Sequence, residues 1–115
     1  MPFEITIPEV PGDPAGMRVL AGALKGDART IEGIASGVGS AVGSLTFEGP
    51  AADRLQSTTQ SSGDSLGDCA DRLNDLARLL EVKADEVEQR QRDRLERIRQ
   101  LREEYAAQGV PARVN

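Results

Sequence analysis

The stretch that decides the fold is SLTFEGPAADRL, residues 44–55, because it interrupts two long amphipathic patterns. Phe47 is one of only three aromatic side chains in 115 residues. It is followed by Glu48 and then by a Gly-Pro pair. Gly49 tolerates the backbone angles of a tight bend, and Pro50 suits the first turn of a helix. The segment Phe47–Pro50 therefore predicts the bend of a helical hairpin.

The residues before this bend predict one helix of about 30 residues, judged by the length of its apolar repeat. Asp13 can cap its first turn, and Pro14 suits its first position, where no backbone donor is needed. Six interior glycines each cost about 0.5–1 kcal/mol relative to alanine, so packing must supply the order of this helix. Its apolar stripe recurs at sevenfold spacing and consists of Met17, Leu24, Ile31, Val38 and Leu45.

The residues after the bend predict a second, longer helix. It extends from Pro50 to about Gln108, which is about 88 Å at 1.5 Å per residue, so the first helix can cover only about half of it. Gly109 and Pro111 supply its stop. Its apolar positions are Leu66, Leu73, Leu76, Leu80 and Val87, continued after one shift by Leu95, Ile98, Leu101 and Tyr105.

Folding back at the bend brings small residues of the two helices opposite each other. Gly33, Gly37, Gly39 and Gly43 would face residues 56–62, the run QSTTQSS. Small residues on both sides predict that the two backbones approach closely here.

Four segments follow from these patterns: an N-terminal arm over 1–12, the helical hairpin over 13–85, a C-terminal helical extension over 86–108, and a flexible tail over 109–115. In the arm, Phe3, Ile5 and Ile7 alternate with polar neighbours, and three prolines exclude a helix. The arm is either flexible or a strand that orders against a partner.

A hairpin of two helices buries each apolar stripe only in part and would leave a contiguous apolar band in water. The simplest solution is a second hairpin, which gives an all-α four-helix bundle of a homodimer or a heterodimer. The side chains expected at this interface are Met17, Leu24, Ile31, Val38, Leu66, Leu73, Leu76 and Leu80.

Residues 83–104, which overlap this extension, carry seven basic and seven acidic residues. Balanced charge of this kind is typical of a solvated helix with local ion pairs. The alternative is a helix that docks a partner through Leu95, Ile98, Leu101 and Tyr105. The sequence does not decide between the two.

Composition argues against catalysis and against several kinds of ligand. The chain has no histidine, which removes histidine-activated nucleophiles and the common metal sites. Cys69 falls in an apolar row and is interpreted as a small buried side chain. Asp64, Asp68, Asp71 and Asp75 are interpreted as a solvated face with ion pairs from Asp68 to Arg72 and from Asp75 to Arg78. The sequence therefore predicts no enzyme, no cofactor and no metal.

The charge and hydropathy of the chain exclude two further partner classes. A formal charge of −5 argues against nucleic acid, which is bound by basic surfaces. No apolar run approaches the roughly 20 residues of a membrane span. The N-terminus, MPFEITIPEV, lacks the pattern of a secretory signal peptide.

At this point the chain resembles the WXG-motif family, the small helical hairpins that are substrates and partners of type VII (ESX) secretion systems. Phe47-Glu48-Gly49 stands where the family has Trp-x-Gly, and Ala51 and Ala52 follow Pro50 as alanines do in the family. The resemblance covers residues 13–85. It implies a four-helix bundle formed with a like chain or with the N-terminal hairpin of a larger effector.

The resemblance also implies a location and a role. Members are secreted or cell-surface proteins that leave by a route independent of a signal peptide, and otherwise they are cytoplasmic. Their export signal is a tyrosine followed four residues later by an acidic residue, whereas here Tyr105 is followed by Gly109. Leu95, Ile98, Leu101 and Tyr105 would then be a degenerate export element. The alternative function is a cytosolic coiled-coil adaptor or chaperone for a larger effector or toxin.

Overall fold

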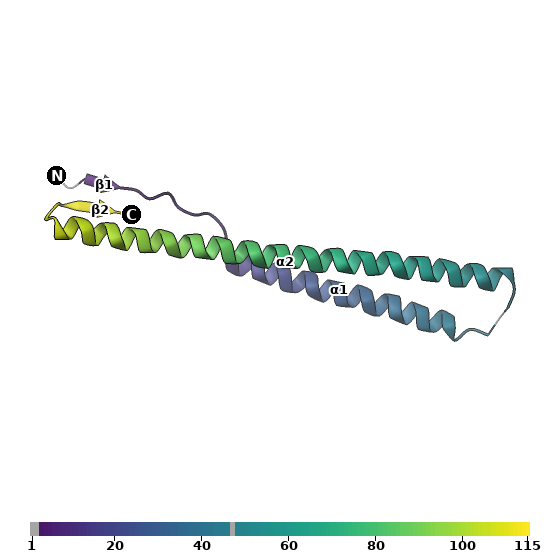
Figure 1. The fold of residues 1–115 in the computed structure, drawn as a ribbon. Coiled ribbons are helices and arrows are strands. Elements are labelled where there is room, and N and C mark those ends of the chain that lie inside the picture. Colours follow the sequence, from purple (N-terminus) through teal and green to yellow (C-terminus); the bar gives the residue numbers. More distant parts are fainter. Residues whose placement is uncertain (1–2, 47) are drawn as a thin grey trace. The chain divides into compact units, whose positions relative to one another are not determined.

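The structure, a computed structural model, describes residues 3–46 and 48–115. The element order is β1 (Phe3–Ile5), α1 (Pro14–Gly43), α2 (Pro50–Ala107) and β2 (Ala112–Val114). α1 has 30 residues and α2 has 58, so the chain is all-α apart from two short strands. The predicted pair of helices with a long second member is confirmed (Figure 1).

The N-terminal ends of α1 and α2 have the capping contacts and backbone angles that the sequence predicted. The Asp13 carboxylate accepts a hydrogen bond from the Gly16 amide at 3.1 Å, which caps the first turn of α1. Gly49 has a φ of 106°, and its carbonyl accepts from the Asp53 amide at 3.1 Å, so α2 begins at Pro50 directly after a left-handed glycine.

The end of α2 is a Schellman motif centred on Gly109. Its φ is 71°, and its amide donates to the Ala106 carbonyl at 3.1 Å. The Val110 amide donates to the Tyr105 carbonyl at 3.0 Å, which completes the pair of bonds that defines the motif. The chain therefore turns away from the helix axis within two residues, as the predicted stop required.

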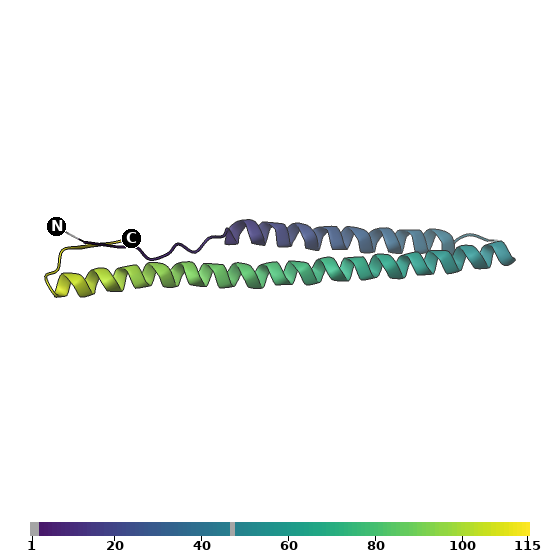
Figure 2. The same cartoon turned by 90° about the horizontal axis from the view of Figure 1, so that it is seen from above.

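The chain forms two compact units. The hairpin unit comprises residues 18–81, and the strap unit comprises residues 1–17 and 82–115. In the hairpin unit, α1 and the first part of α2 lie side by side and run in opposite directions (Figure 2). The coarse prediction of an antiparallel hairpin is confirmed.

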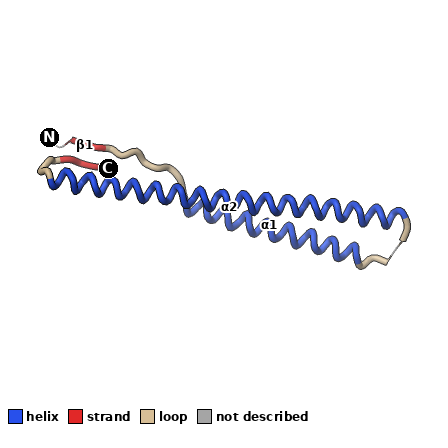
Figure 3. The backbone as a smooth tube through the Cα atoms, viewed as in Figure 1, coloured by secondary structure: helices blue, strands red, loops and turns tan. Residues whose placement is uncertain are grey.

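In the strap unit, β1 and β2 form a two-stranded parallel sheet (Figure 3). Phe3 pairs with Ala112, and Ile5 pairs with Val114. The Asn115 amide donates to the Ile5 carbonyl at 3.0 Å, and the Ile7 amide donates to the Asn115 carbonyl at 2.9 Å, which extends the ladder. The sequence predicted a flexible tail over 109–115, whereas the structure has a strand there, because its partner strand lies about 110 residues earlier in the chain.

Candidate functional site: an uncovered apolar face

The seam between the two helices of the hairpin unit is lined by alanine. Among its described residues, every buried side chain belongs to an alanine, and these are Ala21, Ala28, Ala52, Ala70 and Ala77. Alanine buries little apolar surface, so the two helices stabilise each other only modestly. The large apolar side chains must therefore lie elsewhere on the hairpin.

The large side chains follow the alanines at a fixed offset of three residues on both helices. Three residues correspond to a rotation of about 60° from the seam. Because the helices are antiparallel, the same offset on each turns both rows toward the same side of the hairpin. The pairs are Ala21 and Leu24, Ala28 and Ile31, Ala35 and Val38 on α1, and Ala70 and Leu73, Ala77 and Leu80 on α2.

We call this side the apolar face. Val38 and Leu76 each keep 47% of their surface exposed, and Leu79 keeps 66%. Leu20, Ile34 and Leu45 are also more than half exposed. Side chains at these exposures give up about half of the roughly 1.5–3 kcal/mol that full burial of each supplies. An uncovered apolar face of this length is typical of a protein-binding surface.

None of the eight side chains predicted for the interface is buried. Val38 and Leu76 are exposed, and the other six are half-buried. Seven of them belong to the hairpin unit, and Met17 belongs to the strap unit. The seven in the hairpin unit are Leu24, Ile31, Val38, Leu66, Leu73, Leu76 and Leu80.

Cys69 was predicted to be buried, and this prediction is wrong. The thiol is exposed, because Cys69 lies seven residues before Leu76 and shares its row on the apolar face, beside the alanine seam and not in it. Arg72 lies one turn further along α2 and was expected to pair with Asp68. The structure has no such pair among its described residues, whereas the pair of Asp75 and Arg78 is present at 3.5 Å.

The predicted close approach of the glycine-rich part of α1 to α2 is also wrong. Gly39 and Gly43 do lie opposite Gln56, Thr59 and Gln60, as expected. The two helices line an open hollow of about 390 Å³ there and do not form a tight contact. A Cβ atom added at Gly39 or Gly43 would meet nothing within 4 Å, and the same holds at Gly33 and Gly37. The glycines therefore leave space in this chain that its own residues do not fill.

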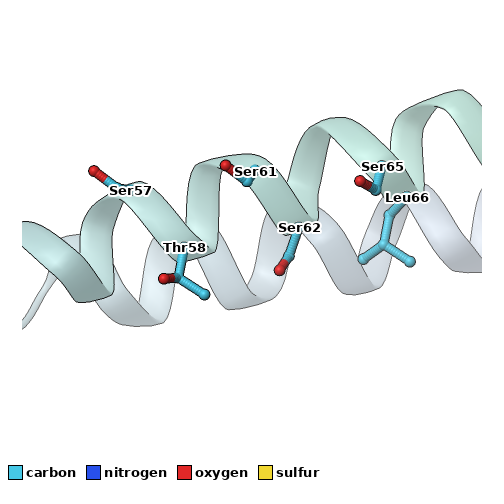
Figure 4. A pocket seen from close by; sticks show the side chains of 6 residues that line it. All are labelled: Ser57, Thr58, Ser61, Ser62, Ser65 and Leu66. Atoms are coloured by element: carbon cyan, nitrogen blue, oxygen red, sulfur yellow. The ribbon is translucent and has the colours of Figure 1, made fainter.

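A second hollow lies on α2 near the bend, and all of its lining residues come from that one helix (Figure 4). Five of the six side chains carry hydroxyl groups, and none of the six titrates near neutral pH. They are Ser57, Thr58, Ser61, Ser62, Ser65 and Leu66. This arrangement offers no acid, base or activated nucleophile.

The strap unit contains the large buried side chains of the described chain. Ile98, Leu101 and Val114 form one cluster, and Ile5, Ile7 and Tyr105 pack against it. Val114 is 1% exposed. Ile98 and Leu101 were two of the four residues expected to dock a partner or to belong to an export element. The chain's own strands cover both of them, and Leu95 of the same row remains 62% exposed.

Side chains of α2 bind backbone carbonyls of the segment that follows β1, residues 7–12. The Arg94 guanidinium donates to the carbonyls of Ile7 and Pro8 at 3.2 Å each. Gln91 donates to the carbonyls of Val10 and Gly12 at 3.2 Å each. These bonds satisfy groups that an irregular segment cannot satisfy by itself. The sequence offered a flexible arm or a strand ordered by a partner, and the structure has a segment ordered on the same chain.

Arg102 binds the C-terminal strand, β2. Its guanidinium donates twice to the Val114 carbonyl, at 2.8 Å and 3.2 Å. Such charge-assisted bonds are stronger than those between neutral groups. No sequence pattern marked Arg94, Gln91 or Arg102, because their acceptors are backbone atoms that any residue supplies.

The outer surface of α2 carries local ion pairs, which were expected under one of the two interpretations of the charged segment. Arg99 bonds Glu96 and also Glu103, the latter at 2.6 Å. Hydrogen bonds from Arg99 lower the pKa of the Glu96 carboxyl, and its bond to Glu96 raises the pKa of the Arg99 guanidinium. All three groups are in water, so these pairs contribute little to stability.

In residues 3–46 and 48–115, no group of histidine, cysteine and carboxylate side chains could hold a metal ion. Within the same ranges, no helix is long and apolar enough to cross a membrane. Phe47, the residue on which the family resemblance depends most, lies outside the described residues.

Comparison of the chain with protein-family models, with characterised proteins and with solved structures found no match. The apolar face and the sequence around the bend are therefore the features that point to a function.

Proposed function

We propose that this chain is a helical-hairpin protein of a type VII (ESX) secretion system that acts by protein–protein binding and not by catalysis. The partner would be a second helical hairpin, and the product a four-helix bundle. One observation carries the binding part of the proposal. The described residues of the hairpin unit bury only alanine in their seam, while the leucines and isoleucines of both helices lie on one uncovered face.

The bend carries the secretion part of the proposal. α2 begins at Pro50 after a left-handed Gly49, which is a bend suited to the position of the family's Trp-x-Gly motif. The chain would reach the cell surface or the medium without a signal peptide. Gly109 at the position expected for an acidic residue supports export on a partner's signal.

A second function fits one specific observation. Tyr105 is half-buried against Ile98 and Leu101, so the degenerate export element is occupied by contacts within the chain. A cytosolic coiled-coil adaptor or chaperone, which keeps an effector or toxin soluble through the same apolar face, needs no export element.

Co-expression with the products of neighbouring genes distinguishes these functions. A secretion substrate is recovered from the culture medium together with its partner hairpin, and its recovery requires an intact type VII secretion system. An adaptor stays in the cells bound to the effector. Recovery in neither form, with no partner captured by the full chain, would contradict both proposals.

Replacement of the bend aromatic tests the family resemblance separately. We expect Phe47→Ala to reduce export or partner capture at least several-fold. Thr46→Ala, at the exposed neighbouring position, is the matched control and should leave both unchanged. Equal export and capture by Phe47→Ala and the wild type would remove the motif from the argument.

A further inference from the structure

The strap unit has a groove along α2, beside the segment that follows β1. β2 ends at Val114, whereas the segment after β1 continues along α2 as far as Gly12 (Figure 3). β2 therefore covers α2 only near its C-terminal end. Leu95 lies beyond this cover and keeps 62% of its surface exposed, although Ile98, one turn later in the same row, is only 7% exposed.

Two open hollows make up the groove, and Arg94 and Leu95 line both of them. The larger hollow has a volume of about 380 Å³ and extends along α2 from Arg94 to Arg102. The smaller hollow has a volume of about 220 Å³ and extends from Gln91 to Leu95. Together they cover about 17 Å of α2, which is the length of about five residues of extended peptide.

Two arginines give the larger hollow a positive charge that the described residues do not neutralise. Arg94 and Arg102 bind only backbone carbonyls, through their Nε and Nη2 atoms. Among the described residues, their Nη1 groups have no hydrogen-bond partner and neither guanidinium has an ion pair. Arg99 lines the same hollow, but Glu96 and Glu103 already bind it. A carboxylate in this hollow would therefore find unused donors and form charge-assisted bonds with them.

The other end of the groove has the opposite charge. Glu9 is exposed, lines the smaller hollow, and has no ion pair with any residue that the structure describes. Its carboxylate repels an anion and attracts a cation. Leu95 lies between the two ends. The groove therefore favours a ligand with an acidic group toward Arg102, a basic group toward Glu9 and an apolar group between them.

From these observations we propose that the groove binds an extended peptide segment of another protein, in which one apolar side chain lies between a basic and an acidic side chain. The apolar side chain covers Leu95, and the acidic side chain binds the free edges of Arg94 and Arg102. Alternate residues of an extended peptide point to the same side, so the first, third and fifth residues make these contacts. The site belongs to the strap unit, so this inference does not depend on the proposed function, and either can fail alone.

An NMR titration of the full chain with a five-residue peptide tests the ligand. The probe is Lys-Ser-Leu-Ser-Glu with both ends blocked, so that its glutamate is the only carboxylate. We expect a dissociation constant below about 1 mM and shifts of the amides of residues 8–10, 91–102 and 114–115. The same peptide with glutamine in place of glutamate should bind about tenfold more weakly, and added salt should reduce this difference.

Two single substitutions test the residues of the groove. Leu95→Ala removes the apolar contact at an exposed position and should weaken binding about fivefold. Arg102→Gln removes a charge but keeps an amide donor for the Val114 carbonyl, so it should weaken binding of the glutamate peptide about tenfold and leave the glutamine peptide unaffected. Arg97→Gln is the matched control, because Arg97 is exposed on the opposite side of α2 from Leu95 and should not affect binding.

Unchanged amide shifts of residues 3–5 and 112–114 in the free variants show that the strands remain paired. If Arg102→Gln separates them, the glutamine peptide and Leu95→Ala still decide the question.

Three results would overturn the inference: no shifts at several millimolar peptide, equal affinities for the glutamate and glutamine peptides, or an affinity that Leu95→Ala leaves unchanged. Equal shifts with acetate at the same concentration would overturn it as well, because a small anion would then account for the binding.

Discussion

Glycine has three different roles along this chain. Gly12 has a φ of 135°, and a Cβ atom there would lie 2.8 Å from the Val87 side chain, so this position requires glycine twice over. Gly109 has a positive φ that ends α2. Gly33, by contrast, lies inside α1 in open space. It lowers the stability of α1, and no contact of the described residues explains why glycine is there.

Two single substitutions separate these roles. Gly12→Ala should destabilise the strap unit by at least about 1–2 kcal/mol, because the new Cβ meets Val87 and the backbone angle is unfavourable. Gly33→Ala should stabilise the hairpin unit by about 0.5–1 kcal/mol. Urea unfolding monitored by circular dichroism measures both. Equal effects of the same sign would contradict the assigned roles.

At the scale of elements, α2 uses its apolar row in two ways. In the strap unit, Ile98 and Leu101 of this row form a cluster with Val114 of β2, and Ile5 of β1 and Ile7 pack against it. In the hairpin unit, Leu73 and Leu80 of the row remain half-buried. One helix thus combines a segment satisfied by its own chain with a segment that needs a partner.

Alanine substitutions in the strap unit should show that covered and exposed positions of this apolar row contribute unequally to stability. Leu101→Ala removes a side chain that is 8% exposed and should cost about 2–4 kcal/mol. Leu95→Ala lies in the same row but removes a mostly exposed side chain, so it should change stability by less than about 0.5 kcal/mol. Thermal unfolding of the two variants measures the difference. Similar losses would mean that Leu95 is covered in solution.

The sequence predicted the helices, their caps and the bend, because heptad spacing, Asp13, Gly49 and Gly109 act through local geometry. It did not predict which part of α2 would be covered. Two residues that hold the covering segments, Arg94 and Arg102, bind backbone carbonyls outside α2, at Ile7 and at Val114. For the candidate site, the spacing predicted the apolar row, whereas the alanine seam beside it and the exposure of Cys69 required the relative rotation of two helices.

At the scale of the whole molecule, the two units differ in what they bury. Among the described residues, the strap unit buries valine, isoleucine and leucine, and the hairpin unit buries alanine alone. Burial of larger side chains gives more stabilisation per residue, so local stability should be unequal along the chain.

Hydrogen exchange measures this inequality residue by residue. Amides of residues 88–105 should be protected at all protein concentrations. Amides of residues 20–43 and 55–78 should exchange faster in dilute solution and become protected as the concentration, or a bound hairpin, increases. Uniform protection of both ranges in a dilute monomer would show that the alanine seam is sufficient by itself.

The parallel pairing of β1 with β2 joins segments separated by nearly the whole sequence. During synthesis, β1 leaves the ribosome long before β2 exists, so the two strands cannot pair until residues 112–114 have been translated. Until then, Ile5 and Ile7 lack the cluster against which they pack in the finished chain. A nascent chain therefore passes through an interval in which a chaperone can recognise it by a surface that the finished protein hides.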